Sequence, residues 1–522
     1  MIYFLSFFWL LRQIKANLFW LYLWQLKEYH IGRFIDHFRT YKGKSLFFNN
    51  LMFIKLVLLF FAYDCPVCWS FLLVPLVLIT YLLESSKFGY NVIFKKILIK
   101  PILTKKTIFL IIVSFIFVFC WYFFLFNLDL KSFVFYLLLF DVLTPFVISG
   151  IVLVFQPFVV LMRNQVIAKA KKKRAKFKNL IVIGITGSYG KTSCKEFLYE
   201  VLKTKYNVLK TEKNQNSEIG ISQCVLNDLK PEHEVFIVEM GAYGRGGIKL
   251  LCDIVQPKIG VLTGINEQHM ALFGSQDNIT KTKFELIESL PKTGLAVLNG
   301  NNDIVRNLKP QTDKFVFCST KEELGFWAKN IVLEKESVNF RANSRDEDSA
   351  QFKINVLGVE NIENILLVSA VAKELGMSLE EVARACENIK TVNTKLFKDV
   401  NGVDIIDSTY SANPNGVFSH LNHLKLWSGK KVVVMHCLIE LGSASSEIHR
   451  KIGEKIAQTC DLAIITTADR FNDIKKGGGD KIVFLEKPSL IFEKIKEFLN
   501  SENVILLEGR ISKEIKDLIY GS

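Results

Sequence analysis

Acidic residues are scarce in the first 165 residues of this 522-residue chain, although Lys and Arg are not. That region is rich in Phe and Leu, whereas the rest has the composition of ordinary globular domains. The N-terminus also lacks the short apolar core and small-residue cleavage site of a signal peptide, so no cleaved leader is expected. The contrast predicts a membrane region followed by soluble domains.

Paired cysteines are also rare. The ten Cys are scattered, apart from Cys65 and Cys68, which form a CxxC motif. Such a pair can bind metal or carry redox chemistry, but no second pair or histidine lies near it in the sequence. We therefore favour a membrane turn with small apolar residues. The single cysteines of the globular part indicate a reducing cytoplasm.

The net charge of +15 is high enough to suggest nucleic acid binding. The basic residues, however, gather between apolar runs and in the stretch 169–178. The orientation of membrane loops explains this distribution better, and no nucleic acid partner is expected.

Five apolar runs occupy the first 165 residues, and a helix needs about 20 apolar residues to span a membrane. Arg12 and Lys15 interrupt the first run, and the second is too short. The runs are residues 2–24, 51–62, 66–83, 107–128 and 132–161.

Basic clusters between these runs indicate their orientation. The clusters lie at residues 25–45, 84–106 and 169–178. If they face the cytoplasm, the segments between them form hairpins, which turn at Asp64 and near residues 129–131. This predicts four spans, a first segment that spans or lies in the interface, and a cytoplasmic C-terminal part.

Asp141 lies inside the last apolar run, close to Pro145. An acid at membrane depth is costly and often functional. It could equally pair with another helix or sit in a polar kink, and both interpretations stay open.

A phosphate-binding loop is predicted after the basic stretch. Residues 180–186 have the pattern of a buried strand, a Gly-rich turn follows, and residues 194–202 resemble a helix. In this arrangement backbone N–H groups approach phosphate oxygens, Lys neutralises charge and a Thr hydroxyl reaches Mg²⁺. The predicted nucleotide contacts are Gly187, Ser188, Gly190, Lys191, Thr192 and Ser193.

The string 184–193 resembles the ATP loop of the Mur ligases, and further motifs follow in that family's order. The Tyr410-Ser-Ala-Asn413-Pro414 and Glu440-Leu-Gly442 segments resemble its MurF branch in particular. The other matching segments are residues 211–220, 238–242, 263–269, 273–275, 283–285, 299–303 and 358–364. The resemblance spans about residues 180–522 and covers none of the membrane region.

The resemblance implies an α/β fold in two parts. A central ATP-binding domain with a mainly parallel sheet is expected at 179–391, and a Rossmann-like C-terminal domain at 392–522. A helical multi-span region at 1–165 and a basic cytoplasmic linker at 166–178 would precede them. ATP would bind between the two α/β domains, and closure would assemble the site.

Joining a carboxylate to an amine requires activation, which ATP supplies by forming an acyl phosphate. Metal ions and Lys compensate the gathered negative charge. Glu239 ends a buried strand, the usual place for ligand contacts in an open α/β sheet, and His269 follows another strand. The resemblance implies that Thr192, Glu239 and His269 hold Mg²⁺, and Mn²⁺ suits the same ligands.

Lys283 would be an unusual metal partner as an ammonium ion. The resemblance implies that CO₂ carbamylates it, which makes an anion able to bind Mg²⁺; Lys281 is a weaker candidate by register. The alternative is a solvated lysine on an amphipathic helix. Lys191, His269 and Lys283 are thus the expected catalytic residues.

The resemblance also implies ligand contacts that no single residue would indicate, because isolated Asn residues are ordinary in turns. The implied nucleotide contacts are Asn299, Asn361, Lys395 and Asp407. The implied substrate contacts are Asn214, Asn216, Tyr410, Asn413 and Pro414.

Several positions depart from the MurF pattern, while the phosphate loop and metal candidates are intact. Lys395 replaces an Arg and loses its bidentate geometry. Glu360 replaces a His, and Ser408 the second of two Asp residues. A late Lys-Gly-Ser-Arg segment becomes Glu508-Gly-Arg-Ile. ATP chemistry is therefore better supported than the nucleotide and amine contacts.

The resemblance implies an ATP-dependent ligase that adds a D-amino-acid dipeptide, D-alanyl-D-alanine, to a muramoyl-peptide precursor in a bacterium. Soluble Mur ligases begin with a small domain that grips UDP, where this chain has membrane helices. With these helices, the enzyme would either act on a lipid-linked precursor or be held beside other membrane cell-wall enzymes that use its product.

Three alternatives remain open. One is a Mur-type ligase that adds another amino acid or a glutamate-like unit, or that acts on a lipid-linked substrate. Another is a catalytically impaired nucleotide-binding membrane scaffold, which the C-terminal departures would suit. A transporter is disfavoured because no ABC-type signature is visible.

Overall fold

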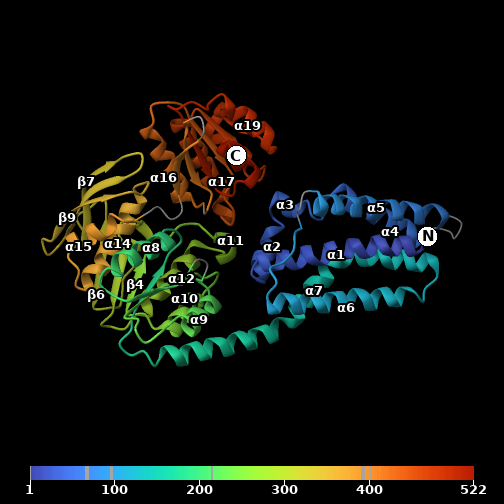
Figure 1. Cartoon of the computed structure of the whole chain (residues 1–522), viewed down its shortest axis with the longest axis horizontal. Coiled ribbons are helices and arrows are strands. Elements are labelled where there is room, and N and C mark those ends of the chain that lie inside the picture. The colour runs from blue at the N-terminus through green and yellow to red at the C-terminus, as the bar shows by residue number, and fades with distance from the viewer. Residues whose placement is uncertain are drawn as a thin grey trace. The chain divides into compact units, whose positions relative to one another are not determined.

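The computed structural model describes residues 2–64, 70–94, 98–212, 215–389, 394–399, 402–410 and 412–521. It divides the chain into two compact units, Met1–Met162 and Arg163–Ser522 (Figure 1). We call them the helical unit and the α/β unit.

The helical unit contains seven helices within its described residues, the last of which continues into the α/β unit. They are α1 (Ile2–Leu26), α2 (Ile31–His37), α3 (Tyr41–Lys44), α4 (Asn50–Asp64), α5 (Ser70–Ile93), α6 (Lys105–Leu125) and α7 (Leu130–Arg174). Three described segments are long and apolar enough to cross a membrane: Leu72–Ile93, Lys105–Leu125 and Leu130–Arg174. The α4 helix is apolar but shorter, as its run predicted.

The connections agree in part with the predicted hairpins. The α6 and α7 helices are separated by four residues, close to the turn expected near residues 129–131. The α5 helix continues to Ile93, beyond the expected end of its apolar run. Cys65 and Cys68, after the expected turn at Asp64, lie outside the described residues.

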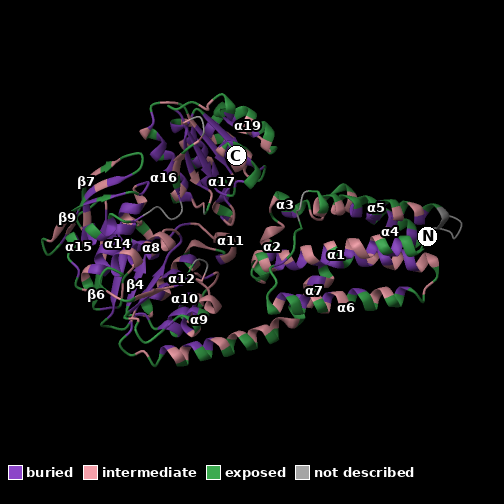
Figure 2. Ribbon diagram, viewed as in Figure 1, coloured by how far each residue is buried: buried purple, intermediate pink, exposed green. Residues whose placement is uncertain are grey.

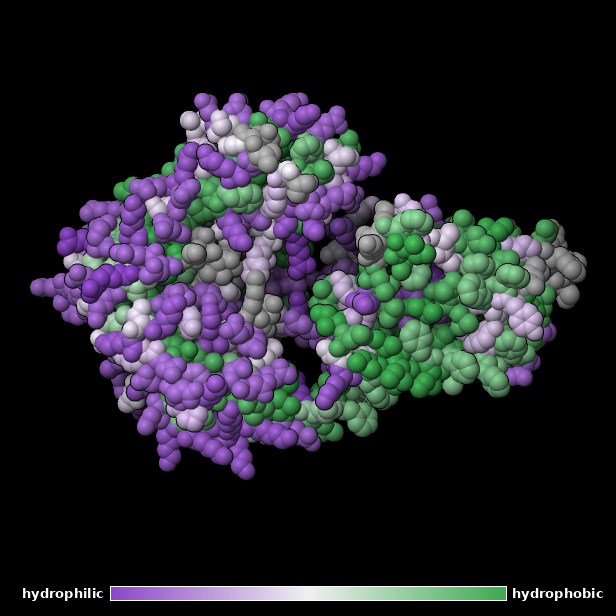
Figure 3. All heavy atoms as spheres, viewed as in Figure 1, coloured by the Kyte–Doolittle hydropathy of each residue, from purple (hydrophilic) through white to green (hydrophobic). Residues whose placement is uncertain are grey.

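Large apolar side chains cover much of the face of the helical unit seen in Figure 3. On α6 alone, Phe119 and Phe123 are about two-thirds exposed. A soluble protein rarely exposes so large an apolar surface, whereas helices that face lipid expose apolar side chains along their length.

Four charges, which we call the charge tetrad, join helices α1, α4, α5 and α7; Lys55, Glu84 and Asp141 are buried and Arg12 is partly buried. Lys55 Nζ lies 2.5 Å from Glu84 Oε2 and 2.6 Å from Asp141 Oδ2. Arg12 Nε lies 3.0 Å from Glu84 Oε1 and 3.7 Å from Asp141 Oδ1. Gln13 also donates to Asp141, at 3.1 Å. Asp141 therefore pairs with other helices, which was one of the two interpretations left open.

The first α/β domain is built on a nine-stranded sheet in the order β2-β3-β1-β4-β5-β6-β7-β8-β9. Pairing is parallel as far as β7 and antiparallel from β7 to β9. The strands are β1 (Ile181–Thr186), β2 (Val208–Lys210), β3 (Val235–Glu239), β4 (Ile259–Leu262), β5 (Leu295–Asn299), β6 (Lys314–Ser319), β7 (Phe326–Leu333), β8 (Val338–Ser344) and β9 (Ser349–Ile354).

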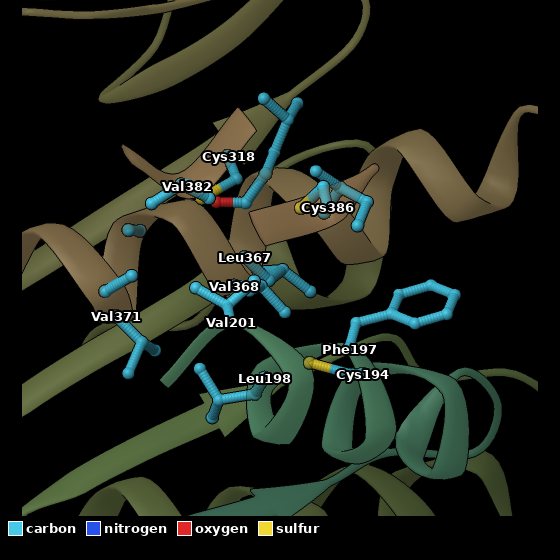
Figure 4. Packing of buried hydrophobic residues seen from close by; sticks show 14 of the residues in the cluster. Cys194, Phe197, Leu198, Val201, Cys318, Leu367, Val368, Val371, Val382 and Cys386 are labelled. Carbon is cyan, nitrogen blue, oxygen red and sulfur yellow. The ribbon is translucent and has the colours of Figure 1, made fainter. Parts of the chain in front are cut away.

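Helices cover both faces of this sheet, and Figure 2 shows the buried residues concentrated between the layers. On one face, side chains of α8, α14 and α15 interlock around Phe197, Val368 and Cys386 (Figure 4). The opposite face packs against α9, α10 and α12. The helices are α8 (Lys191–Leu202), α9 (Glu218–Asn227), α10 (Gly247–Val255), α11 (Met270–Phe273), α12 (Gln276–Glu288), α13 (Asp303–Arg306), α14 (Glu360–Glu374) and α15 (Leu379–Cys386).

The second α/β domain has a six-stranded sheet in the order β10-β11-β15-β12-β13-β14, in which only β10 is antiparallel to its neighbour. Its strands are β10 (Lys395–Lys398), β11 (Asp404–Ser408), β12 (Lys431–Met435), β13 (Leu462–Ile465), β14 (Ile482–Phe484) and β15 (Val504–Glu508). Its helices are α16 (Pro414–His423), α17 (Ser445–Thr459), α18 (Phe471–Gly478), α19 (Pro488–Lys496) and α20 (Lys513–Tyr520), with 3₁₀ turns η2 (Leu424–Leu426), η3 (Gly442–Ala444) and η4 (Gly479–Lys481). The predicted α/β class, with a mainly parallel sheet, is confirmed.

The end of α7 belongs to the α/β unit, since the helix continues to Arg174 through part of the expected linker 166–178. Ile167 and Ala170 are buried in the core shared with α9. Arg174 donates to the carbonyls of Val255 and Phe177, both at 2.8 Å. These residues are packed structure rather than a free tether. The expected boundary near residue 391 lies outside the described residues.

Candidate active site

The loop between β1 and α8 has a shape that requires glycine at two points. Gly187 and Gly190 have φ of +149° and +76°, which L side chains rarely adopt. A Cβ at Gly187 would lie 2.1 Å from Thr263 Oγ1, and one at Gly190 would lie 2.7 Å from Asn364 Oδ1. Ser188 N donates to the carbonyl of Gly264 at 2.7 Å. The loop is therefore held open at the start of α8, where backbone N–H groups can face an anion.

Lys191 and Thr192 open α8 and point back over this loop. Lys191 Nζ donates to the carbonyl of Gly187 at 2.7 Å, so its charge lies along the turn. Thr192 Oγ1 donates to Glu239 Oε2 at 3.0 Å, which joins the loop to the end of β3. This is the chemistry needed to hold a phosphate chain and its cation together.

The Glu239 carboxylate is held from several sides. Asn216 Nδ2 donates to Glu239 Oε1 at 3.1 Å, and Thr192 donates to the other oxygen. The backbone N–H of Glu239 donates to Thr211 Oγ1 at 3.0 Å, which fixes the end of β3. Asn214, the other expected substrate contact of this segment, lies outside the described residues.

Lys195 is a buried cation that the sequence analysis missed. Its ammonium lies 3.5 Å from Glu239 Oε2 and 3.2 Å from Glu196 Oε1, and the residue is fully buried. The other oxygen of Glu196 binds Lys210. The sequence feature that could have indicated Lys195 is its position four residues after Lys191, on the same side of α8.

His269 and Lys283 lie beside the loop. His269, at φ +67°, meets Glu440 through Nδ1 and Oε2 at 2.5 Å. Burial lowers the pKa of His269, although Glu440 opposes the shift. Burial, and then the nearby charge of Lys191, lower the pKa of Lys283 to about 7. Lys283 is thus set apart from an ordinary surface lysine.

Lys281, the weaker candidate, is placed differently on the same helix. Its side chain is about half exposed and pairs with Asp277 at 2.7 Å, one helical turn away. Lys283 is only 3% exposed and lies within electrostatic reach of His269. Of the two lysines, only Lys283 faces the loop.

We call Lys191, Lys195 and Lys283 the lysine cluster. Lys195 and Lys210 face the carboxylates of Glu196 and Glu239, so Lys191 adds a positive charge beyond these pairs. Lys283, with its pKa of about 7, adds part of another. Such a surplus is expected to be compensated by an anion, as a polyphosphate and a carboxylate substrate would do. Among the described residues, no three His, Cys, Asp or Glu side chains gather into a ready-made metal site. The oxygens of Glu239 and Thr192, together with bound phosphate, nevertheless suit Mg²⁺.

The expected nucleotide contacts Asn299 and Asn361 are engaged within the first α/β domain. Asn299 Nδ2 donates to the carbonyl of Thr263 at 2.7 Å and to Glu363 at 2.8 Å. Asn361 Nδ2 donates to the carbonyl of Leu357 at 2.7 Å. Asn299 thus braces the strand ends below the loop, while Asn361 borders a cavity.

Lys395 and Asp407 lie opposite each other on the paired strands β10 and β11. Lys395 is exposed. Asp407 accepts hydrogen bonds from Tyr520 Oη at 2.6 Å and from the Thr409 N–H at 2.9 Å, and these partners lower its pKa despite partial burial. Its carboxylate is therefore charged and fixed in orientation.

The segment from Tyr410 to Pro414 has a local structural explanation. Asn413 caps α16 by accepting from the Gly416 N–H at 3.1 Å, and Pro414 occupies the first helical turn, where its missing N–H costs nothing. Tyr410 is 43% exposed and lies within electrostatic reach of Glu239. Of these residues, Tyr410 has the side chain most available to a ligand.

Polar contacts join the two α/β domains at this site. Asn266 Nδ2 donates to Asn415 Oδ1 at 2.7 Å, and His269 meets Glu440. A further contact runs from the Ser419 hydroxyl to Glu360. Together they bring the phosphate loop of one domain against the start of α16 in the other.

A cavity of about 90 Å³ lies at this junction, next to the phosphate loop. It is bordered by Tyr189, Gly190, Ser193, Phe197, Glu360, Asn361, Asn364, Thr394, Ser408, Asn413, Asn415, Gly416 and His420. Loop, cavity and lysine cluster together form one composite site.

Comparison with known families gives two matches. The profile described as the Mur ligase middle domain matches residues 185–372, and the one described as "Mur ligase, glutamate ligase domain" matches residues 394–511. Together the matched ranges cover more than half of the chain and include the whole composite site.

Individual relatives carry MurF names. The UDP-N-acetylmuramoyl-tripeptide–D-alanyl-D-alanine ligase of Bacillus subtilis is 27% identical over 352 residues, 65% of this chain and 76% of the relative. The MurF ligase of Thermotoga maritima in complex with ADP superposes with a TM-score of 0.63 at 26% identity, covering 69% of this chain and 83% of that one. MurF from Acinetobacter baumannii shares the fold, with a TM-score of 0.63 at 24% identity over 68% of this chain and 79% of that one.

Proposed function

Since the chain belongs to the Mur ligase family, we propose that it is an ATP-dependent ligase that adds D-alanyl-D-alanine to a muramoyl-tripeptide precursor. The carboxylate would first be phosphorylated by ATP, and the dipeptide amine would then displace phosphate to form the amide. This assigns the chain to peptidoglycan synthesis.

The observation that carries the proposal is the buried lysine cluster around a phosphate loop. Lys191 lies along the loop, and Thr192 joins it to Glu239 at 3.0 Å. Phosphoryl transfer to a carboxylate gathers several negative charges, and catalysis consists largely of holding and neutralising them. The surplus positive charge suits that task.

Thr192, Glu239 and His269 are the residues we assign to Mg²⁺, which when bound would neutralise the phosphate chain and the developing charge. His269 would have to exchange its present contact with Glu440 for this role. Lys191 would hold the phosphates against the loop.

We assign Lys283 to carbamylation, as the family resemblance implies. Its neutral amine adds to CO₂ and loses one proton, which converts a cationic side chain into a carboxylate-bearing one. Its burial and its pKa of about 7, lowered by burial and Lys191, keep a large fraction of the amine neutral near neutral pH. The anion would then join Glu239 in compensating Mg²⁺.

We assign the amine side of the site to residues of the second α/β domain. Tyr410 is exposed and lies within reach of Glu239. Asn413 and Pro414 would act by fixing the start of α16, while Asn216 would hold the carboxylate substrate's side of the site. Asn299, Asn361, Lys395 and Asp407 remain proposed nucleotide contacts.

We further propose that the helical unit anchors the enzyme in the cell membrane as a multi-pass region, with the α/β unit in the cytoplasm. Three long apolar helices and the exposed apolar surface support this. The basic residues near the helix ends favour that orientation. The partners expected there are membrane lipid and other membrane-bound cell-wall enzymes.

The test of the ligase is phosphate release by the purified full chain with ATP, muramoyl-tripeptide and candidate dipeptides. Release that depends on D-alanyl-D-alanine supports the proposal. Release that depends on another amine would assign the same chemistry to a different acceptor. ATP binding without release under any combination would support the nucleotide-binding scaffold.

A second candidate substrate is a lipid-linked muramoyl peptide, favoured by the apolar helices that precede the family match. The purified enzyme would be offered UDP-linked and polyprenyl-linked precursors in the same detergent. Turnover of the UDP-linked form alone would exclude the lipid-linked candidate.

A further inference from the structure

The cavity beside the phosphate loop differs from the lysine cluster, because an acid and a histidine are among its lining residues and no lysine is. Glu360 lines it from the first turn of α14, and His420 lines it from α16. Gly190 and Ser193 of the phosphate loop border the same space. A molecule whose phosphates occupy the loop could therefore extend a neighbouring group into this cavity.

The Glu360 carboxylate is held in place from two sides. It folds back over Gly358. A Cβ at Gly358 would lie 2.3 Å from Glu360 Oε2, so no side chain fits there, and the φ of +87° also favours glycine. The Ser419 hydroxyl of the second domain donates to the same carboxylate. A carboxylate has about four acceptor positions, so this contact leaves others available.

His420 pairs with a second buried acid. Its Nδ1 lies 2.7 Å from Glu508 Oε2, and Thr394 Oγ1 lies 3.3 Å from its Nε2. Burial lowers the pKa of His420, but Glu508 and Glu360 outweigh that effect and raise it. Burial raises the pKa of Glu360, and the neighbouring His420 opposes that shift. Glu508, the nearer partner of His420, lies outside the cavity lining, so Glu360 is the carboxyl group that faces the cavity.

The Glu360 carboxylate restricts what the cavity can accept. A phosphate group would meet like charge from it and is proposed to bind at the loop and the lysine cluster instead. The complementary ligand is an uncharged group with an N–H or O–H donor. In a nucleotide bound by the loop, that group belongs to the nucleoside.

We propose that Glu360 is a specificity-determining residue of the nucleotide site, which accepts a hydrogen bond from the nucleoside. The donor is either an amino group of the base or a hydroxyl of the ribose. The inference rests on the proposed function in assuming that the loop binds a nucleoside triphosphate. In the MurF pattern a His stands at this position. A carboxylate, which only accepts hydrogen bonds when charged, would therefore select a different group of the nucleoside than an imidazole would.

The test measures equilibrium binding of nucleotides to the full chain by calorimetry, so it does not depend on turnover. The probes are ATP, the purine riboside triphosphate that lacks the amino group, and the 2′-deoxy and 3′-deoxy forms of ATP. For the wild type, the analogue that lacks the relevant donor should bind about tenfold more weakly than ATP, as loss of a hydrogen bond to a charged group predicts.

Glu360→Ala should weaken ATP binding about tenfold and reduce the ratio between ATP and that analogue to about one. Glu360→Gln, which keeps the shape and one acceptor, should retain part of the ratio and guards against a folding defect. The matched control is Glu374→Gln, at the exposed end of the same helix, where Glu374 pairs with Lys314. It should leave every ratio unchanged.

Two results would overturn the inference. One is a wild type that binds ATP and all three analogues equally. The other is a folded Glu360→Ala or Glu360→Gln protein with an unchanged ratio. Failure of the proposed function is distinct, because it would appear as absent phosphate release while nucleotide binding and its selectivity persist.

Discussion

Two clusters of charged side chains, one in each unit, differ in net charge. The charge tetrad of the helical unit contains two cations and two carboxylates, and each is paired at 2.5–3.0 Å. In the lysine cluster, Lys191 and the partly charged Lys283 exceed the two carboxylates, Glu196 and Glu239, that Lys195 and Lys210 face. Most of these groups are buried, with Arg12 and Lys191 only partly so, and the chain itself balances only the tetrad.

The difference indicates which cluster serves the fold and which serves a ligand. A balanced cluster has its partners in place and joins four helices without further molecules. A surplus of one sign in a buried site remains costly until a counter-charge arrives. Asp141 is therefore explained by pairing, and the lysine cluster by the anions of the proposed reaction.

The largest expected effect comes from unbalancing the tetrad. Lys55→Met leaves two carboxylates with one cation, and removing one partner of a buried pair costs about 3–5 kcal/mol. Thermal unfolding of the purified chain in detergent, followed by Trp fluorescence, measures it. Adding Asp141→Asn restores the balance and should recover part of the loss. Lys44→Met, at an exposed position of α3, is the control. A tolerated Lys55→Met would show that the tetrad does not hold the helices together.

Removing a lysine from the other cluster should affect activity instead of folding. Lys191→Ala is expected to reduce amine-dependent phosphate release about 10²–10³-fold, the usual cost of losing a group that stabilises transferring charge. The exposed Lys281→Ala should change the rate less than twofold. If both variants keep full rates, the phosphate loop is not the catalytic site.

The proposed carbamylation of Lys283 makes activity depend on pH and CO₂. Because burial and Lys191 lower its pKa to about 7, lowering the pH from 8 to 6 should reduce the neutral amine that reacts with CO₂ about tenfold. The carbamylated fraction, and with it the rate, should fall at least as much, because carbamate formation also releases a proton. Added bicarbonate should restore part of the rate at low pH. Lys283→Ala should lose the bicarbonate response, whereas Lys281→Ala keeps it. A wild type indifferent to CO₂ depletion would remove the modification.

A smaller effect on stability than that of Lys55→Met concerns the segment that ends α7. A chain that begins at Arg163 keeps Ile167 in the core and the hydrogen bonds of Arg174. A chain that begins at Asn179 loses both, and we expect it to be about 2–3 kcal/mol less stable to urea. Equal stability would mean that this helical segment is a tether after all.

The sequence predicted the local elements of the site well, because each element depends on a short run of neighbouring residues. The strand before Gly187, the glycines of the loop and the start of α16 at Asn413-Pro414 all depend on neighbouring residues. The α/β class was implied by the family resemblance that these motifs carry. Helix ends were less predictable, since α7 continues through basic residues that resemble a linker.

The roles that escaped prediction depend on contacts between distant segments. Lys195 resembles any helix lysine until β3 brings Glu239 to 3.5 Å from its ammonium. Glu360 stood out only as a departure, and its pocket partner His420 was not noticed. Neither local pattern nor spacing reports that α14, α16 and β15 meet, because that depends on how two domains pack.

The junction between the α/β domains has a consequence for the timing of the reaction. Each domain has an apolar core of its own, although Leu357 of the first domain packs in the core of the second. The other contacts described above between the domains are polar, such as Asn266 to Asn415. Such a joint separates at modest cost, so opening can occur within each catalytic cycle. Departure of ADP and the extended peptide would then set the pace of turnover, and the rate would fall as the viscosity of the solvent rises.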